Sequence, residues 1–295
     1  MSLNNWLKKN TTSLKHKNIV ITGTTNGLGL ETLKLLAKLE ASVIVGVRNT
    51  VRAEEQKREI LKKYPTAEIT ILKVDLSDAR SIKDFANRVN FLCSFGIDAL
   101  INNAGVFSNS KELLQNGHER HYFTNFVAPI YLSKTLLPLL EMKQNSKIIF
   151  LSSISKNFTK INFDDFEFKN NRKDIDAYAN SKRLLTYAAM KLKEESKDVH
   201  VNIVHPGISP TALFSNSSFK IFSPLLKLLF PSAKKACLNE VAGLFFETKQ
   251  NEWIGPRIFN IWGKPKKSKN KIKNFNQSEF DKCHEKTTEI LNELP

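Results

Sequence analysis

The chain has few cysteines and no long hydrophobic run. Its 295 residues include only three cysteines, Cys93, Cys237 and Cys283. An odd number at wide spacing suits reduced thiols better than a disulfide framework or a metal site. No stretch approaches the roughly 18 uncharged apolar residues of a membrane-spanning helix, and residues 1–17 lack the apolar core of a secretory signal. We therefore expect a cytoplasmic protein.

Acidic residues are scarce relative to basic ones. There are 45 Lys and Arg against 29 Asp and Glu, a formal net charge of +16 at pH 7. Such an excess attracts nucleic acid, anionic lipid or anionic small molecules, and charge alone does not choose among them. Much of it is Lys mixed with Asn over residues 264–273, which is typical of a solvated tail. Because no nucleic-acid-binding module is recognisable, no nucleic-acid partner is expected, and the histidines lack metal-ligand spacing, so no metal is expected.

Short β-branched runs alternate with longer amphipathic stretches, which predicts an α/β fold. The pattern is that of a doubly wound (Rossmann) parallel sheet of about seven strands with helices on both faces. Since no repeat or interdomain linker is visible, we expect one domain over 1–295, with a core over about 18–261 and a Lys-rich extension over about 264–295 that holds a short helix near Glu279–Leu291. The predicted strands are Asn18–Thr22, Ser42–Val47, Glu68–Val74, Asp98–Ile101, Lys147–Leu151, Val199–Val204 and Arg257–Ile261.

A glycine-rich turn follows the first predicted strand. It reads Thr22-Gly23-Thr24-Thr25-Asn26-Gly27-Leu28-Gly29, and a helical run begins at Leu30. Glycines let the backbone approach a pyrophosphate, and the start of the next helix offers unpaired N–H groups and a favourable dipole. A glycine cluster alone could be a plain turn. Its place at the first strand-to-helix junction favours a nucleotide site.

The spacing Gly-x-x-x-Gly-x-Gly resembles the short-chain dehydrogenase/reductase family. That resemblance implies an Asp after the third strand that bonds adenine, matched by Asp75, and an Asn-Asn-Ala-Gly segment after the fourth, matched by residues 102–105. Singly, Asp75 could be a helix N-terminal residue and Asn102 a turn former. Together and in order, they support the family. The cofactor contacts implied here are Gly23, Thr25, Asn26, Gly27, Leu28, Gly29, Asp75, Leu76, Asn103, Ala104 and Gly105.

The end of the second strand predicts which nucleotide binds. NAD-binding members carry an acidic residue there, which accepts bonds from the ribose hydroxyls. Here Val47 holds that place and Arg48 follows it. A guanidinium can form a bidentate pair with a 2′-phosphate. The alternative is that Arg48 is an exposed surface arginine without a role in binding. NADP(H) is therefore expected in preference to NAD(H).

A catalytic group follows the fifth predicted strand. Tyr178 lies 25 positions after Ser153, and Lys182 lies four after Tyr178, so Tyr178 and Lys182 share a helix face. An ammonium near a phenol stabilises the phenolate, and together with a positive nicotinamide ring it should lower the tyrosine pKa from ~10 towards neutrality. The resemblance implies that Tyr178 transfers the proton, Ser153 holds the substrate oxygen, Lys182 also bonds the nicotinamide ribose, and Asn125 holds a water in the proton relay. Ser152, one residue off register, is expected to be structural.

The segment after the sixth strand completes the predicted site. The resemblance implies that Pro206, Gly207 and Ile208 back the nicotinamide and that Thr211 fixes its carboxamide, while His205 is expected to be structural. The apolar residues 213–231 are then the substrate lid, although a helix packed on the core is the alternative. Lys220 and Lys227 within that segment would permit shallow docking on an anionic membrane.

Within the family, the chain is closest in pattern to the retinol dehydrogenase and protochlorophyllide reductase branch. The long insertion between Ser153 and Tyr178 and the run Val47-Arg48-Asn49 carry this likeness. It implies an NADP(H)-dependent oxidoreductase acting on a hydrophobic carbonyl or alcohol. Two other functions stay open: a catalytically silent NADP-binding sensor or scaffold, and a basic lipid- or nucleic-acid-associated protein with an inherited fold. The native substrate, the direction of the reaction and the oligomeric state are not predicted.

Overall fold

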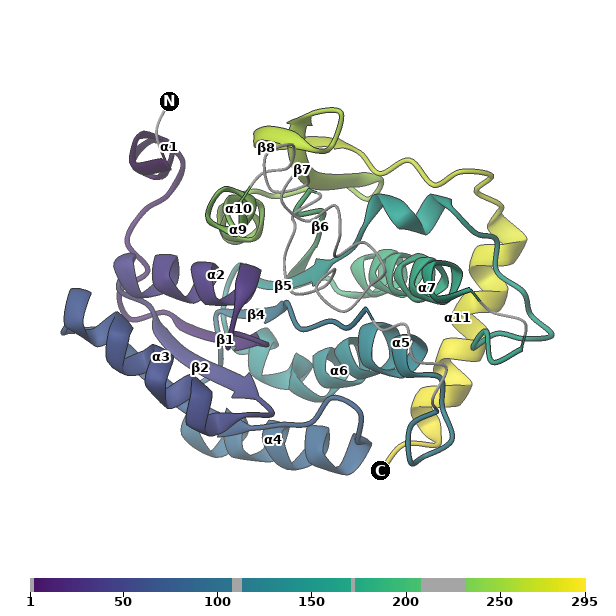
Figure 1. Cartoon of the computed structure of the whole chain (residues 1–295), viewed down its shortest axis with the longest axis horizontal. Helices are drawn as coiled ribbons and strands as arrows, with labels where there is room; N and C mark the ends of the chain where they lie inside the picture. Colours follow the sequence, from purple (N-terminus) through teal and green to yellow (C-terminus); the bar gives the residue numbers. More distant parts are fainter. Residues whose placement is uncertain (1–2, 108–112, 171–172, 208–231) are drawn as a thin grey trace, which may run out of the picture.

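The central sheet confirms the doubly wound architecture. The computed structural model describes residues 3–107, 113–170, 173–207 and 232–295. Across these ranges one eight-stranded sheet has the order β3-β2-β1-β4-β5-β6-β7-β8 (Figure 1). The strands are β1 (Asn18–Thr22), β2 (Ser42–Val47), β3 (Glu68–Lys73), β4 (Ala99–Asn102), β5 (Ser146–Leu151), β6 (Val199–Val204), β7 (Glu252–Ile258) and β8 (Trp262–Lys269). Neighbours from β1 to β7 pair in parallel, so their carboxyl ends meet at one edge of the sheet.

Helices cover both faces of this sheet. One face carries α1 (Leu3–Asn10), α2 (Gly27–Lys38), α3 (Thr50–Lys63), α9 (Ala233–Ala236) and α10 (Leu238–Phe245). The other carries α4 (Ala79–Leu92), α5 (Arg120–Tyr122), the π-helix η1 (Phe123–Val127), α6 (Ala128–Glu141), α7 (Asp174–Glu195) and α11 (Gln277–Asn292). Successive side chains of β1 alternate between the two layers, since Val20 packs in one buried cluster and Ile19 and Ile21 in the other. This is why the predicted strands are apolar on both faces.

The end of the sheet corrects two predictions. The last strand was expected at Arg257–Ile261, but β7 spans Glu252–Ile258, and Phe259 and Asn260 form a turn with φ of 49° and 56°. The lysine-rich segment was expected to be a solvated tail, but most of it is β8, paired antiparallel with β7. An edge strand has one free side and tolerates lysine, so its composition resembles that of a tail.

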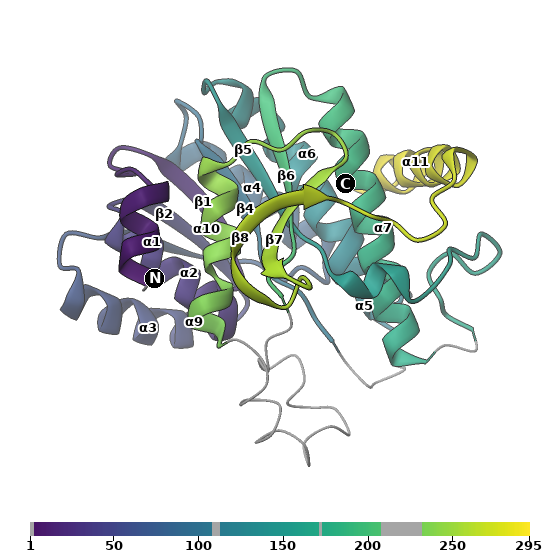
Figure 2. The ribbon, with the colours of Figure 1, turned by 90° about the horizontal axis from the view of Figure 1, so that it is seen from above.

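The rest of the extension is docked rather than solvated. The helix predicted near Glu279–Leu291 is α11, which packs beside α7 (Figure 2). Arg183 of α7 is 1% exposed in its side chain, and its guanidinium donates to Glu279 at 2.8 Å. Tyr187 donates its hydroxyl to the same carboxylate oxygen at 2.7 Å. A buried ion pair therefore fastens the C-terminal helix to the helix that carries Tyr178 and Lys182. No helix within the described ranges is long and apolar enough to cross a membrane.

Candidate active site

The glycine turn closes against the segment after β4. Asn103 donates its side-chain amide to the carbonyl oxygens of Thr22 and Gly23 at 2.7 and 2.8 Å. A Cβ on Gly23, where φ is 75°, would lie 2.8 Å from the Ala104 Cα, and a Cβ on Gly29 would lie 2.3 Å from the Asn103 amide nitrogen. Only glycine fits at these two places, because both the space and, at Gly23, the backbone angle exclude a larger residue.

The start of α2 suits an anionic ligand. The helix begins at Gly27, and its N-cap residue Asn26 makes no side-chain cap hydrogen bond. No acidic side chain lies in the first turn. The first amides of a helix lack partners within it and carry the positive end of its dipole, so they can bond phosphate oxygens. The residues present therefore fit the pyrophosphate of a dinucleotide.

The ends of β2 and β3 place the other predicted nucleotide contacts. Arg48 is exposed directly after β2, while Asn49 caps α3 by accepting from the Arg52 amide at 2.9 Å. Asp75 follows β3, and its Oδ1 accepts from the backbone and hydroxyl of Ser77 at 2.9 and 2.6 Å. The alternative role for Asp75 was that of a helix N-terminal residue, but the N-cap of α4 is Asp78.

Tyr178 and Ser153 meet at the carboxyl edge of the sheet. Ser153 follows β5 and caps the short 3₁₀ helix η2 (Ile154–Asn157), where its hydroxyl accepts from the Ser155 amide at 3.2 Å. Tyr178 is partly buried near the start of α7. Burial raises the pKa of Tyr178 to about 12, and the hydrogen bond with Ser153 opposes that rise. The neighbouring Ser152 is buried and bonds Thr186 at 2.7 Å instead.

Lys182 lies beside Tyr178 but bonds elsewhere. Its Nζ is 5.8 Å from the centre of the Tyr178 ring and donates to the Leu151 carbonyl oxygen at 2.8 Å. Burial lowers the Lys182 pKa to about 8. Among the protein groups alone, burial of the phenol outweighs the stabilisation of its phenolate. The lowering of the Tyr178 pKa towards neutrality also requires the positive nicotinamide ring, and it stays a prediction.

Asn125 joins the nucleotide segment to the helix of Tyr178. It lies in the π-helix η1, a rare form that often marks functional positions. Its amide oxygen accepts from the Val106 backbone at 2.7 Å, and its amide nitrogen donates to the Val106 carbonyl and to the Ser181 hydroxyl at 2.9 and 3.2 Å. A Cβ on Gly105 would lie 3.3 Å from that amide oxygen. Asn125 therefore fixes residues 105 and 106 against α7.

Sequence reasoning missed a buried acid and histidine behind Tyr178. Glu119 and His121 are both 0% exposed in their side chains, and His121 Nδ1 lies 2.9 Å from Glu119 Oε1. The centres of the His121 and Tyr178 rings are 6.2 Å apart in an edge contact, and Phe107 packs edge-on to Tyr178 at 5.2 Å. Burial raises the pKa of Glu119, but hydrogen bonds with His121 and the Tyr122 amide bring it below its usual value. A signal was available, since His121 precedes Asn125 by four positions.

The turn after β6 packs against β7 and the residues that follow it. Gly207 has φ of 91°, and a Cβ there would meet the Ile261 carbonyl oxygen at 3.0 Å. His205 is buried, stacks on Trp253 with ring centres 5.2 Å apart, and its Nε2 lies 2.9 Å from the Asn260 carbonyl oxygen. Burial lowers its pKa to about 4, so the ring is neutral at pH 7. Ile208, Thr211 and the predicted lid over 213–231 lie outside the described residues.

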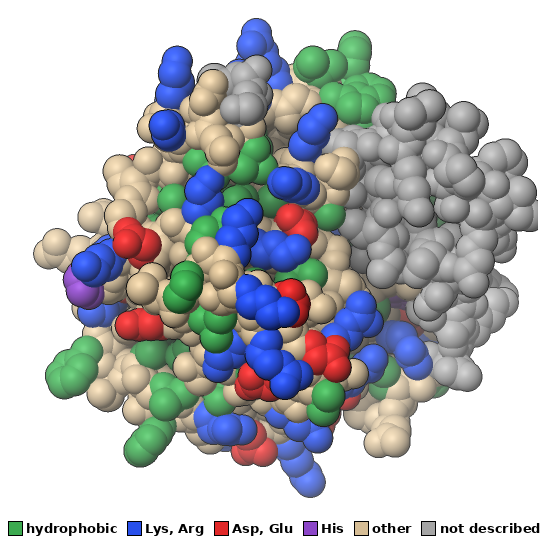
Figure 3. All heavy atoms as spheres, turned by 60° about the vertical axis from the view of Figure 1, so that its left-hand side comes forward, with side chains coloured by type: hydrophobic (Ala, Val, Ile, Leu, Met, Phe, Trp, Pro, Cys, Tyr) green, Lys and Arg blue, Asp and Glu red, His purple; other side chains and the backbone are tan. Residues whose placement is uncertain are grey.

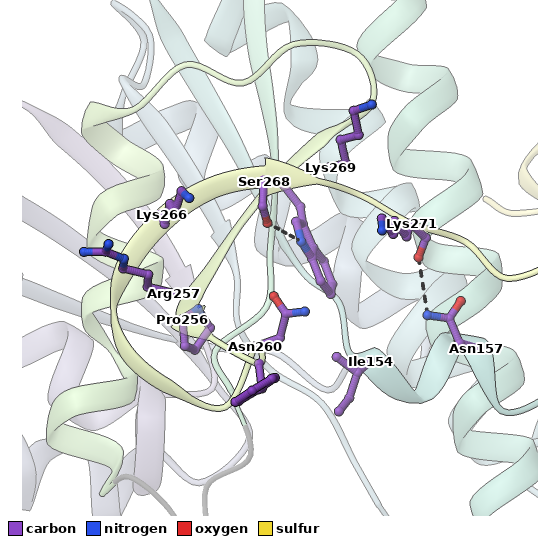
Figure 4. A pocket seen from close by; sticks show the side chains of 11 residues that line it. Ile154, Asn157, Pro256, Arg257, Asn260, Lys266, Ser268, Lys269 and Lys271 are labelled. Atoms are coloured by element: carbon purple, nitrogen blue, oxygen red, sulfur yellow. Dashed lines mark hydrogen bonds between the residues drawn. The ribbon is translucent and has the colours of Figure 1, made fainter.

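A cavity of about 580 Å³ lies beside Trp253, the residue on which His205 stacks (Figure 4). It lies between η2, which begins one residue after Ser153, and the pair β7–β8. In Figure 4, Arg257 and Lys266 lie at one end and Asn157 and Lys271 at the other. Its walls are Ile154, Asn157, Trp253, Pro256, Arg257, Phe259, Asn260, Lys266, Ser268, Lys269 and Lys271.

Comparisons with known sequences agree with this geometry. A family model described as short chain dehydrogenase matches residues 17–220. The short-chain dehydrogenase TIC 32 B, chloroplastic, of Brassica napus is 35% identical over 215 residues, which are 69% of this chain and 67% of that protein. Retinol dehydrogenase 12 of Bos taurus is 30% identical over 259 residues, 83% of this chain and 81% of its own length.

Solved structures show the same fold. A crystal structure of an uncharacterized protein from Mycobacterium paratuberculosis has a TM-score of 0.74 at 23% identity and covers 96% of this chain and 97% of its own. A short chain dehydrogenase from Shigella flexneri 2a, in complex with NADP, has a TM-score of 0.60 at 21% identity and covers 78% of this chain and 92% of its own.

Proposed function

Because the chain belongs to the short-chain dehydrogenase family, whose members are NAD(P)-dependent oxidoreductases, we propose that it reduces the carbonyl group of a hydrophobic substrate with NADPH, or oxidises the matching alcohol. The observation that carries this proposal is the meeting of Ser153, Tyr178 and Lys182 at the edge of the sheet where the glycine turn lies. A bound nicotinamide dinucleotide would supply or accept the hydride.

The residues of the site would manage the proton and the substrate oxygen. A phenol with a pKa of about 12 keeps its proton at neutral pH, so Tyr178 would be ready to donate to a substrate oxygen held by the Ser153 hydroxyl. Oxidation requires Tyr178 to be a phenolate, so that it can accept the proton of the alcohol, and a nearby positive charge stabilises that phenolate. The Lys182 ammonium, 5.8 Å from the ring centre, would supply that charge and bond the nicotinamide ribose.

NADP(H) is the proposed cofactor, and NAD(H) the alternative. Support comes from the exposed Arg48 directly after β2 and from the absence of an acidic residue in Gly46-Val47-Arg48-Asn49. The Asn49 side chain is engaged in capping α3, which leaves Arg48 as the polar group placed for a 2′-phosphate. We further assign Asp75 to adenine, Asn125 to a water in the proton relay, and Pro206, Gly207, Ile208 and Thr211 to the nicotinamide.

A hydrophobic substrate is supported by the surroundings of Tyr178. Phe107 packs edge-on against its ring, with ring centres 5.2 Å apart. The name of one relative, retinol dehydrogenase 12, indicates an apolar alcohol for that protein. Peripheral contact with a membrane, from which such a substrate would be drawn, is part of this proposal.

Steady-state profiling of the full chain tests the proposed function. NADPH and NADH consumption would be followed with apolar aldehydes and ketones of increasing length, and NADP⁺ reduction with the matching alcohols. We expect turnover with NADPH that rises with apolar chain length. If NADPH binds in a titration yet no substrate in the panel turns over, the chain is a silent NADP-binding protein and the proposed activity is wrong.

A further inference from the structure

The turn between β7 and β8 exposes large apolar side chains. Phe259 is 83% exposed, Ile258 50% and Trp262 39%. The turn is also fixed in shape, because the Asn260 carbonyl oxygen bonds the His205 ring. Within the turn, Phe259 and Asn260 both have positive φ. Positive φ is unfavourable for Phe259, whereas Asn adopts it more readily, and the contact with His205 helps to fix the turn. We call residues 253–275 the basic hairpin.

The basic hairpin carries positive charge without compensation. Between Trp253 and Ser278 the sequence contains no Asp or Glu, yet it contains seven cations: Arg257, Lys264, Lys266, Lys267, Lys269, Lys271 and Lys273. Elsewhere the charges are mixed, as on the face in Figure 3, where Lys and Arg side chains lie among acidic ones. On β8, Trp262, Lys264 and Lys266 share one side of the strand, because side chains alternate. Aromatic groups and lysines therefore occur together.

The hairpin lies beside the candidate active site. β7 runs parallel to β6, so the turn that ends β7 lies at the same edge of the sheet as the end of β6 (Figure 2). A Cβ on Gly207, one of the residues predicted to back the nicotinamide, would lie 3.0 Å from the Ile261 carbonyl oxygen and 3.1 Å from the Pro256 Cγ, so the hairpin lies directly beside that turn. A surface that bound the turn would face the mouth of the site.

We propose that the basic hairpin docks this protein on an anionic lipid membrane, with Phe259 and Trp262 inserted at the interface and the lysines on headgroup phosphates. Aromatic side chains favour the interface, and each lysine near an anionic surface adds attraction. The cavity walled by Arg257, Lys266, Lys269 and Lys271 would receive a headgroup. This inference rests on the proposed function only for its purpose, which is to deliver an apolar substrate from the membrane to the site.

Two alternative roles of the hairpin fit the structure less well. Lysines on an edge strand do prevent edge-to-edge aggregation, but that role does not account for an exposed Phe259 and Ile258 beside them. A symmetric dimer through the hairpin would bring the same seven cations of both copies together without an acidic residue to pair them.

Vesicle co-sedimentation of the full chain tests the docking. We expect binding to vesicles containing about one third phosphatidylserine, weak binding to pure phosphatidylcholine, and release by salt. Phe259→Ser should weaken binding at least about 10-fold, since a buried apolar side chain is lost. Lys264→Gln and Lys266→Gln should each weaken it about 5-fold.

The controls use equally exposed groups at the opposite edge of the sheet. Phe91 and Phe95 are 85% and 84% exposed near the end of α4, and Lys62 and Lys63 are exposed at the end of α3. Phe91→Ser with Phe95→Ser, and Lys62→Gln with Lys63→Gln, should leave vesicle binding unchanged. Equal losses in hairpin and control variants, or no binding of the wild type at low salt, would overturn the proposal.

Further measurements separate this proposal from its rivals. Light scattering of the wild type and of Phe259→Ser would show whether the substitution dissociates a dimer. A short RNA or DNA duplex that binds the wild type through the same lysines, while the vesicles do not bind it, would indicate a nucleic-acid surface. Either result overturns membrane docking. Turnover of a short soluble diketone without vesicles should be the same in Phe259→Ser and wild type. If the wild type binds vesicles but shows no turnover, the proposed function is wrong and the docking stands.

Discussion

Tyr178 is the residue on which the proposed chemistry depends. Tyr178→Phe removes the hydroxyl and keeps the ring against Phe107, so cofactor affinity should change little while kcat falls by more than roughly 100-fold, about 2.7 kcal/mol of barrier. Tyr187→Phe, on the same helix, is the matched control, because its hydroxyl bonds Glu279 and should affect stability rather than turnover. Single-turnover kinetics and NADPH titration check both. More than about a tenth of wild-type turnover in Tyr178→Phe would contradict its role.

The charge of Lys182 should make the proton transfer by Tyr178 depend on pH. Burial lowers its pKa to about 8, so the ammonium loses its charge as the pH rises through that value. Alcohol oxidation, which needs a nearby positive charge to stabilise the phenolate, should stop improving above about pH 8 in the wild type. Arg stays charged at these pH values, so the oxidation rate of Lys182→Arg should not level off near pH 8. A profile from pH 6 to about 10 that is identical in both proteins would show that Lys182 does not titrate in the reaction.

Arg48 predicts the preference between nucleotides. Arg48→Ala should weaken NADPH binding by roughly 10- to 150-fold and NADH binding much less, because a charge-assisted phosphate contact is worth about 1.5–3 kcal/mol. Arg58→Ala, also exposed but two turns further along α3, should affect neither nucleotide. Calorimetric titration of both nucleotides distinguishes the variants. Equal losses for NADPH and NADH in Arg48→Ala would show that Arg48 does not read the phosphate.

At the scale of elements, a buried carboxyl joins α2 and α10. Glu240 is fully buried and accepts from the Thr32 hydroxyl at 2.7 Å, and its burial raises the pKa to about 8. The folded state therefore binds a proton that the unfolded state has released, so stability should fall as pH rises from about 4.5 to about 8. Glu240→Gln should flatten this slope and unfold at a higher temperature than the wild type at pH 8. The exposed Glu141→Gln should keep the slope, which thermal melts across that range would show.

The elements also show what the sequence could predict. The strands from β1 to β6 were placed to within one residue at each end, because short apolar runs between turn residues are local signals. β8 could not be predicted, since its lysines indicate solvent and only pairing with β7 makes it a strand. At the site, the four-residue spacing placed Lys182 beside Tyr178, but its bond to Leu151 and the packing of His121 on Tyr178 depend on tertiary contacts.

For the whole molecule, α11 contributes stability through one ion pair. Glu279→Ala leaves Arg183 buried without its carboxylate and should cost about 3–5 kcal/mol in the free energy of unfolding. Glu289→Ala, on the exposed side of the same helix, should cost less than about 0.5 kcal/mol. Urea denaturation measures both. Similar losses in the two variants would mean that the ion pair does not hold α11.

The position of α11 also has a consequence for synthesis on the ribosome. Arg183 of α7 is made almost one hundred positions before its partner Glu279, a separation of 96 residues. Until α11 emerges, the helix that carries Tyr178 and Lys182 holds a guanidinium without its carboxylate and lacks its outer covering. A nascent chain that already contains the nucleotide turn and the whole catalytic group should therefore remain protease-sensitive around α7, and it should gain both protection and activity together when the C-terminal helix docks.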